Sequence, residues 1–582
     1  MAQKNKDWNK SIILLSAIGL VICFAILFPQ LRNLILSYLA EHIIHKDTSI
    51  NLVWNGLFFK FSIVGIFIIL FIDYCCLATS GKALVRKVKR EIVDSISEID
   101  FRSFLKPSFI LLVVYLLGIL TIIRANYSYK DDVWRAAAGS RQWFSWSRYV
   151  SEFFSIFIHG DTRLTDISPI PQLLAILILV VSSVLLVYIL TGKITVPRLL
   201  ASIPLGLSPY FLECLSYKFD SPYMALSVLA SIFPFLFIAR KKIFLFISIV
   251  SLLIMITAYQ PASGIYMMIT TILCFQKWNR REKTNKEILS FLGIAVFSFC
   301  FALLVFRFFL MKPVTSDSEA YVQTTMLPAS QLITGILNNI KGYIMIVNHD
   351  FGMIWKTGIL LVMLFFITKS VSGSAQQKII SIFFIFTAII ISFVFSYGIY
   401  SLLAKPVYPP RALLGFGVLL AVICIYAVSD FKKISTVTVL VLNWCFFVFA
   451  FSYGNALVDQ ARYAEFRIGS LLHDLSVLYP HVNKDSMSIQ FENSIGFSPV
   501  IKNIAKHNPV IERLVPSRLS ESKLEYMYFL TCFNDDRFHT NHEMIDQIPI
   551  DYNSLNLPVV LDSYYHTIQS DGRNRILIVL KH

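Results

Sequence analysis

The sequence predicts a polytopic α-helical membrane protein that carries a small α/β domain at its C-terminal end. Of its 582 residues, 56% are hydrophobic and only 15% are charged, whereas a soluble globular chain averages about 25% charged residues. The apolar residues occur in blocks long enough to cross a bilayer, and residues 454–582 contain no such block. These observations exclude a soluble enzyme, a disordered chain and a fibrous repeat.

The apolar blocks predict about thirteen transmembrane helices. The first block is not followed by a small-residue cleavage site, so a cleaved signal peptide is not expected. In chain order the predicted spans are residues 11–28, 61–79, 107–123, 170–190, 198–213, 222–239, 243–258, 261–275, 288–311, 355–368, 379–402, 412–429 and 434–453.

The distribution of Lys and Arg predicts the orientation of these helices. With the N-terminus in the cytoplasm, Lys and Arg are about three times denser in the inside loops than in the outside loops, as the positive-inside rule requires. An odd number of spans then places residues 454–582 outside. The formal net charge of +16 therefore follows from topology, and no nucleic-acid partner is expected.

The polar region after the last span has the pattern of a folded α/β unit. Residues Asp459 to Tyr479 have helical spacing of apolar side chains. Met487 to Phe491 is typical of a strand, and Val559 to Ile568 and Arg575 to Leu580 predict two strands around the turn at 570–572. A unit of this length is in the size range of an independent domain.

The loop after the third predicted span holds two adjacent carboxylates, Asp131 and Asp132. Ionisable groups next to a membrane are candidate functional residues. The two acids are either helix N-terminal residues that the helix dipole favours, or a general base that orients an acceptor hydroxyl. The loop continues with Arg and aromatic residues, including Arg135 and Arg148, a pattern typical of helices that lie in the membrane interface.

Further polar clusters stand at the outside ends of later spans. Asp166 precedes a Pro-rich start of the fourth span, and Glu213, Tyr217, Lys218 and Asp220 fall within one short loop. Lys218 could hold a phosphate as a point charge, or it could extend along the membrane interface beside solvated acids.

Two tight outside turns complete the set of candidates. Tyr259 and Gln260 form one turn, either a simple hairpin or a substrate contact. Arg411 ends a Pro-rich turn, where it could bind a phosphate in a bidentate manner or cap a span.

An enzyme outside a bacterial membrane has no nucleotide supply, and the chain has no nucleotide-binding glycine loop. A sugar linked to a lipid phosphate is therefore the expected donor.

At these residues the sequence resembles the phage-type, serotype-converting O-antigen glucosyltransferases known as Gtr type II, over roughly residues 107–582. The pieces that carry the resemblance are Tyr129-Lys130-Asp131-Asp132 with Arg135, Gly139, Trp143 and Arg148; Asp166-Ile167-Ser168-Pro169 with Pro171-Gln172; Ser208-Pro209-Tyr210-Phe211-Leu212-Glu213; Leu215-Ser216-Tyr217-Lys218-Phe219-Asp220-Ser221; and Leu561-Asp562-Ser563-Tyr564-Tyr565-His566-Thr567-Ile568 with Asp571-Gly572.

The resemblance implies a membrane glycosyltransferase of the GT-C type. Such an enzyme takes glucose from undecaprenyl-phosphate glucose and attaches it to a sugar of the lipopolysaccharide O-antigen, on the periplasmic side of the inner membrane. It implies that Asp131 or Asp132 is the catalytic base. It further implies donor-phosphate binding by Arg135, Arg148, Lys218 and Arg411. From their places in the outside loops, the candidate substrate-binding residues are Asp166, Glu213, Tyr217, Asp220, Tyr259 and Gln260.

The expected organisation has three parts. Residues 1–106 form a two-span extension with a basic cytoplasmic loop, residues 107–453 form the GT-C-like transmembrane catalytic domain, and residues 454–582 form a periplasmic α/β domain that helps to position the O-antigen.

The expected partners are the lipid-linked donor, the lipopolysaccharide acceptor, membrane lipids, and a lipid-sugar synthase and flippase of the same pathway. No acidic cluster requires a metal, although one acid could help to hold Mg²⁺ or Mn²⁺. The residues leave open whether transfer inverts or retains the anomeric configuration.

Three other functions fit part of the pattern. A flippase or transporter of lipid-linked sugars would place substrate charges at mid-membrane, whereas here they cluster at one face. An O-antigen polymerase or ligase would favour Arg-rich outside loops over an acid pair. A non-catalytic scaffold would show no sugar transfer.

Overall fold

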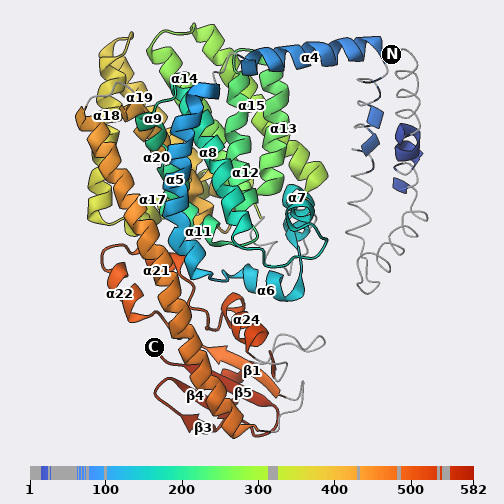
Figure 1. The fold of residues 1–582 in the computed structure, drawn as a ribbon, viewed down its shortest axis with the longest axis vertical. Coiled ribbons are helices and arrows are strands. Elements are labelled where there is room, and N and C mark those ends of the chain that lie inside the picture. Colours follow the sequence, from blue (N-terminus) through green and yellow to red (C-terminus); the bar gives the residue numbers. More distant parts are fainter. Residues whose placement is uncertain are drawn as a thin grey trace.

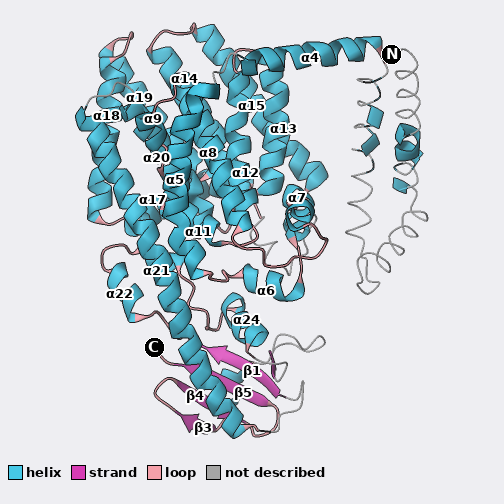
Figure 2. Cartoon of the chain, in the orientation of Figure 1, coloured by secondary structure: helices cyan, strands magenta, loops and turns pink. Residues whose placement is uncertain are grey.

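The computed structural model describes residues 78–97, 101–311, 325–428, 433–480, 487–533, 538–540 and 551–582, together with scattered positions between 15 and 76. The predicted spans at 11–28 and 61–79 lie in part outside the described residues. The described chain is a helix bundle with a small sheet beyond one end (Figures 1 and 2). We call the end of the bundle that faces the sheet the tail-side end, and residues 454–582 the tail.

Eight of the described helices are long and apolar enough to cross a membrane. They coincide with eight of the predicted spans. They are α5 (Phe101–Ala125), α8 (Ile170–Thr191), α13 (Lys241–Ala258), α15 (Asn285–Val305) continued by η5 (Phe306–Leu310), α18 (Met353–Ser372), α19 (Lys378–Ser396), η8 (Pro410–Leu413) with α20 (Leu414–Val428), and α21 (Lys433–Leu478).

The predicted span at 198–213 is a broken helix. It consists of α9 (Val196–Leu200), α10 (Pro204–Leu207) and α11 (Pro209–Ser216). The first half, α9 with α10, meets the second half, α11, at an angle of 62°. Each of the three pieces has a proline in its first turn, where the missing N–H does no harm to the new helix but ends the preceding one. If the bent pair is one span, the described residues contain nine candidates. Two shorter apolar helices lie beside them, α12 (Ser221–Ile232) followed by η3 (Phe233–Phe237), and α14 (Ser263–Asn279).

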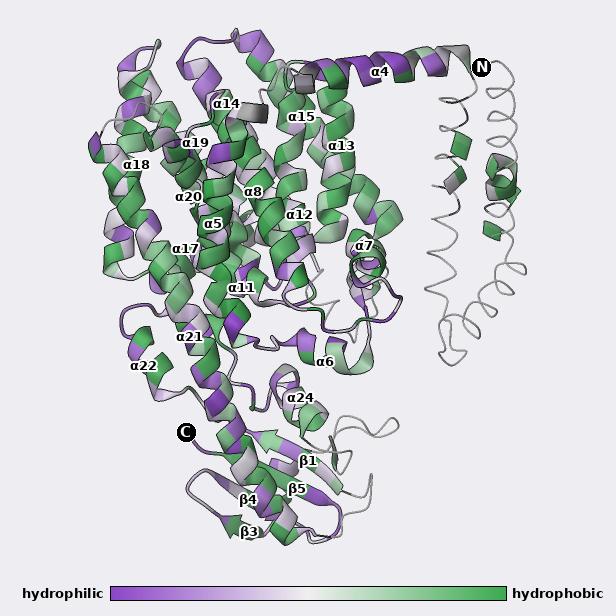
Figure 3. Ribbon diagram, in the orientation of Figure 1, coloured by the Kyte–Doolittle hydropathy of each residue, from purple (hydrophilic) through white to green (hydrophobic). Residues whose placement is uncertain are grey.

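The bundle is organised around α20, in which every residue is buried. The outer helices instead expose large apolar side chains, such as Phe383 and Ile390 of α19. In Figure 3, hydrophobic residues run along most of the length of the bundle helices. Exposed apolar surface on this scale is costly in water and suits a lipid environment. These long apolar helices therefore support a membrane protein.

Two further helices bear on the predicted topology. Helix α17 (Leu332–Asp350) occupies 19 residues of the segment 312–354, which the sequence places outside as a long loop. Helix α4 (Thr79–Ser97) lies across the end of the bundle opposite the tail (Figure 1).

The tail contains one five-stranded mixed sheet. The strands are β1 (Met487–Glu492), β2 (Phe538–Thr540), β3 (Val559–Asp562), β4 (His566–Ser570) and β5 (Arg575–Leu580), in the order β2-β1-β5-β4-β3. Strand β1 is parallel to β2 and β5, and β3-β4-β5 are antiparallel. The strand at 487–491 and the hairpin around 570–572 are thus confirmed, while residues 559–568 form two strands rather than one.

Helix α21 joins the bundle to the tail without a break. It runs for 46 residues, from Lys433 to Leu478, across the predicted domain boundary at 453/454. Its first half packs against α5, and its last turns bury Leu471 and Leu475 in the hydrophobic core of the tail sheet. The tail also contains α22 (Pro499–Ala505), α23 (Val510–Leu514) and α24 (Lys523–Cys532). A continuous helix fixes the tail's direction relative to the bundle more firmly than a flexible linker would.

Candidate active site

The paired carboxylates begin a short helix at the tail-side end. Helix α6 (Asp131–Ala138) starts after Lys130, which has a left-handed φ of 45°, and ends at Gly139, whose φ is 62°. Acids in the first turn are favoured by the helix dipole, and glycine tolerates the left-handed conformation that stops a helix. The sequence therefore places both acids at a fixed helix start.

The two acids have different surroundings. Asp132 is fully buried, and its Oδ2 accepts hydrogen bonds from the backbone N–H groups of Tyr129 and Lys218, each at 3.0 Å. Burial raises the pKa of Asp132 well above its ordinary value. Asp131 is partly exposed, and no group in the described part of the chain donates a hydrogen bond to its carboxylate. Asp131 is therefore the acid that a substrate could reach, and Asp132 ties two loops together.

Glu213 is the centre of the ionic network. Its side chain has 0% exposure, and its Oε1 lies 2.9 Å from Lys130 Nζ and 3.0 Å from Arg411 Nη1. The same oxygen accepts a hydrogen bond from the Tyr129 hydroxyl at 3.2 Å, and Oε2 accepts one from the Arg411 backbone N–H at 2.6 Å. A buried carboxylate is tolerated when its lone pairs are satisfied in this way. Glu213 thus holds the start of α6 against the turn that carries Arg411.

Arg135 and Asp220 form a second buried pair. Arg135 Nε lies 3.3 Å from Asp220 Oδ2, and the guanidinium stacks on the Trp143 ring at 4.1 Å. Asp220 also accepts a hydrogen bond from the Trp143 indole N–H, and Arg135 donates to the Arg141 carbonyl. The charge of Arg135 is therefore already balanced, and the cluster packs the first loop on the segment 217–220.

Lys218 is paired in the same manner. Its Nζ lies 2.7 Å from Asp166 Oδ2, with 4% of the Lys218 side chain and 36% of the Asp166 side chain exposed. The Asp166 Oδ1 accepts a hydrogen bond from the Ser168 backbone N–H. Asp166 is therefore a half-exposed acid that anchors the loop before α8.

Arg148 and Arg411 both lie close to Tyr259. The Arg148 guanidinium lies 4.8 Å from the centre of the Tyr259 ring and donates to Gln260 Oε1 at 3.0 Å. The Gln260 amide in turn donates to the Trp146 carbonyl. Burial raises the pKa of Tyr259, and the charges of Arg411 and Arg148 oppose that rise. These two cations therefore act on one region of the site.

Tyr217 connects this region to the paired acids. It is buried, its ring meets that of Tyr129 edge-on at 4.9 Å, and the Arg411 guanidinium lies 5.4 Å from its centre. The charge of Asp131 acts on both Tyr217 and Arg411. The structure thus gathers the predicted residues into one layer at the tail-side end, with Asp131, Arg148 and Arg411 partly exposed.

A family model described as "Glucosyl transferase GtrII" matches residues 120–448. The chain belongs to the GtrII glucosyl transferase family. It is a glycosyltransferase, and the match includes every candidate site residue named from the sequence.

A phage protein is similar in sequence to this GtrII chain. The "Uncharacterized 55.3 kDa protein in gtrB 5'region" of Salmonella phage P22 is 22% identical over 469 residues, which cover 75% of this chain and 90% of that protein. No solved structure matches this GtrII chain.

The tail closes on the site of this family member through contacts that the sequence did not reveal. Asp350, at the end of α17, is buried and accepts hydrogen bonds from the Tyr210 hydroxyl at 2.9 Å and from Arg513 of the tail. The Tyr129 hydroxyl donates to the Leu514 carbonyl at 2.6 Å. Asp350 and Arg513 are 163 residues apart in the chain, so no local sequence pattern pairs them.

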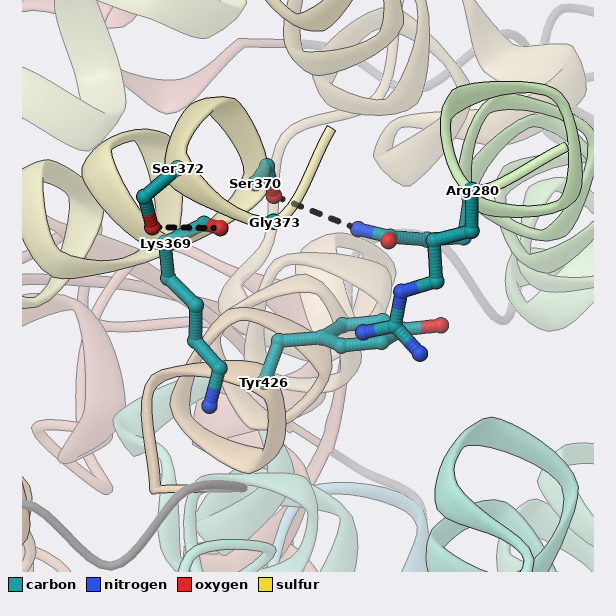
Figure 4. A pocket seen from close by; sticks show the side chains of 7 residues that line it. Arg280, Lys369, Ser370, Ser372, Gly373 and Tyr426 are labelled. Atoms are coloured by element: carbon teal, nitrogen blue, oxygen red, sulfur yellow. Dashed lines mark hydrogen bonds between the residues drawn. The ribbon is translucent and has the colours of Figure 1, made fainter. Parts of the chain in front are cut away.

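The GtrII chain also has a polar cavity at the end of the bundle that lies opposite the tail. It has a volume of about 340 Å³ and is lined by Gln276, Arg280, Lys369, Ser370 and Tyr426, among others (Figure 4). None of the predicted site residues lies there. Within the described residues no group of three His, Cys, Asp or Glu side chains could hold a metal ion, so we assign no step to a metal.

Proposed function

We propose that this GtrII family member transfers glucose from undecaprenyl-phosphate glucose to a sugar of the lipopolysaccharide O-antigen, on the periplasmic side of the inner membrane. One observation carries the choice of residues: Asp131, Arg148 and Arg411 are partly exposed, whereas the charged residues around them are buried and paired. Family membership supports glucosyl transfer, and the resemblance at Asp131 and Arg411 supports the lipid-linked donor.

In the proposed step, Asp131 accepts the proton of the acceptor hydroxyl. The hydroxyl oxygen forms a bond to the anomeric carbon of glucose as the bond from that carbon to the phosphate oxygen breaks. The electron pair of the broken bond remains on the phosphate, which leaves as undecaprenyl phosphate. General-base assistance of this kind contributes about 10²–10⁴-fold to a rate.

Arg148 and Arg411 are the proposed partners of the donor phosphate. Both are partly exposed, and a guanidinium binds phosphate oxygens in a bidentate manner. Charge that develops on the leaving phosphate is stabilised best by cations already held in place. The contacts of Arg411 with Glu213 and of Arg148 with Gln260 provide that preorganisation.

Arg135, Lys218, Asp220 and Glu213 have a positioning role in this proposal. Each is buried and already paired, so a substrate would have to displace an existing ion pair to bind it. Breaking a buried pair is costly. Asp132 likewise holds the loop that carries Asp131, and Asp166, Tyr217, Tyr259 and Gln260 border the substrate.

The proposed side of the membrane rests on charge. The predicted cytoplasmic loops carry the denser Lys and Arg, which puts the N-terminus in the cytoplasm and the tail in the periplasm. A lipid-sugar synthase and a flippase would then supply the donor to this face.

The direct test is transfer in a reconstituted system. The purified full-length protein is incubated with undecaprenyl-phosphate glucose and O-antigen lipopolysaccharide, and mass spectrometry measures added hexose. A gain of one hexose that Asp131→Asn abolishes supports the proposal. A gain only with another polyprenyl-phosphate sugar corrects the donor, and movement of lipid-linked sugar across vesicles without transfer would point to a flippase.

A further inference from the structure

A polar cleft lies where the tail meets the start of α6. It has a volume of about 500 Å³. Its wall is formed by Lys130, by the loop around Asn493 and Phe497, and by the segments around Glu512 and Glu521. Helix α24, which follows Glu521, packs directly against α6 (Figure 1). The cleft is therefore built jointly by the bundle and the tail.

The cleft borders the start of α6, the helix whose first residue is the proposed base. Lys130, which lines it, is the residue before Asp131. Lys130 is held in place by its 2.9 Å ion pair with Glu213, and its left-handed backbone turns the chain into α6. A ligand in the cleft would thus lie between the start of α6 and the tail, while Arg148 and Arg411 contact residues of the bundle.

The charges of the cleft do not suit a phosphate. Its two cations are already ion-paired, Lys130 with Glu213, which Arg411 shares, and Arg513 with Asp350. Glu512 and Glu521 are exposed in its wall, and Glu525 accepts hydrogen bonds from the backbone N–H and hydroxyl of Ser517. Uncompensated carboxylates repel an anion at close range.

The same groups suit a neutral ligand that is rich in hydroxyls. Carboxylates accept hydrogen bonds, and the Asn493 amide both donates and accepts. Phe497 is only partly buried, and its ring provides an apolar face of the kind that ligand sites combine with a few polar groups. A sugar ring has one apolar face and a rim of hydroxyls.

We infer that this cleft binds the acceptor glycan, with the accepting sugar directed toward Asp131, and that Glu512 and Glu521 contribute hydrogen bonds to its hydroxyls. The inference rests on the proposed function, because it needs a glycan acceptor. It places donor and acceptor on opposite sides of Asp131: the donor on the bundle and the acceptor between bundle and tail.

The test compares Michaelis constants for the two substrates of the full-length protein. The variants Glu512→Gln and Glu521→Gln keep the size of exposed side chains, and the expected result is an acceptor KM raised about 3- to 10-fold in each, with the donor KM unchanged. The bulky variant Ser522→Trp, at the exposed rim of the cleft, is expected to raise the acceptor KM further. Glu465→Gln, an exposed tail substitution outside the cleft wall, is the matched control and should change neither constant.

The outcomes separate this inference from the proposed function. If the wild-type protein transfers glucose and both the double Glu512→Gln, Glu521→Gln variant and Ser522→Trp keep the acceptor KM within twofold, the cleft is not the acceptor site, and the proposed function stands. If the wild-type protein transfers no sugar from any lipid-linked donor, the proposed function and the inference both fail.

Discussion

The two ends of the helix bundle carry the same kinds of charged residues in different environments. At the tail-side end, Lys130 and Arg411 meet Glu213, whose side chain has 0% exposure. At the opposite end, Lys277 and Arg280 lie 3.9 and 3.8 Å from Glu282, whose side chain has 47% exposure. Solvated pairs contribute little to stability, whereas buried pairs fix their partners because a lone buried charge is costly. The same residue types therefore form solvated pairs at one end and a buried network at the other.

The difference shows why a count of cations does not locate an active site. Both ends hold a polar cavity with Lys and Arg in its wall, and the cavity in Figure 4 is the more cationic of the two. Among the residues that the structure describes, only those at the tail-side end combine buried, paired charges with a partly exposed acid near them. The following predictions test that contrast, from the largest expected effect to the smallest.

The first prediction separates the paired acids. Asp131→Asn should lower kcat by about 10²–10⁴-fold, since the base is lost. Asp132→Asn should cost about tenfold or less, because an amide oxygen can still accept the N–H groups of Tyr129 and Lys218. Transfer assays on membranes with matched protein levels measure both. Equal losses in the two variants would contradict the separation of roles.

The second prediction concerns the buried network. Glu213→Gln should lower the free energy of unfolding by about 2–3 kcal/mol, below the cost of breaking a fully buried pair because Lys130 and Arg411 keep some solvent contact. Thermal unfolding of the detergent-solubilised protein reports the change. An unchanged melting temperature would show that the network does not hold the site together.

The third prediction concerns the donor side. Arg148→Ala should raise the KM for the lipid-linked donor about tenfold and leave the acceptor KM unchanged, because a charge-assisted contact contributes about 1.5–3 kcal/mol. Arg148→Lys should recover part of the loss, since the charge returns without the bidentate geometry. A rise in the acceptor KM alone would assign Arg148 to the other substrate.

The fourth prediction concerns the pH dependence of the stability of the tail. His566 is buried in β4 with its Nε2 2.9 Å from Asp474; burial lowers the pKa of His566, and Asp474 opposes the shift only in part. Since the unfolded pKa is about 6.5, the unfolded state binds more protons below that value, so tail stability should be lost as the pH falls below it. Proteolysis of the tail at decreasing pH measures this, and His566→Gln should remove the dependence. A wild-type tail equally resistant at low and neutral pH would contradict it.

The last prediction is the smallest. Glu282→Gln, in the exposed cluster at the opposite end, should change stability by less than about 0.5 kcal/mol and leave transfer unchanged. The same unfolding and transfer assays apply. A loss of transfer in this variant would mean that the opposite end also contributes to the reaction.

Hydropathy located the apolar helices because burial in lipid demands long apolar runs. The broken helix at 196–216 escaped this reasoning, although Pro197, Pro204 and Pro209 were visible signals in the sequence. Helix α17 escaped it as well, because an amphipathic segment with several polar residues has no spanning pattern. Strands β1 and β5 of the tail followed from alternation and turn residues, whereas β2 was not predicted and residues 559–568 form two strands. The parallel pairing of β1 with β5 depends on contacts distant in sequence.

The sequence by itself determined the membrane class, most of the apolar helices, the family, and the residues at which the chemistry is proposed. These depend on local composition and motifs, which a single chain displays directly. Only the tertiary structure distinguished Asp131 from Asp132, found that Arg135 and Lys218 are already paired, and brought the tail against α6. Those facts depend on burial and on partners as far apart as Tyr129 and Leu514, and burial decides whether a charge is solvated, paired or available to a substrate.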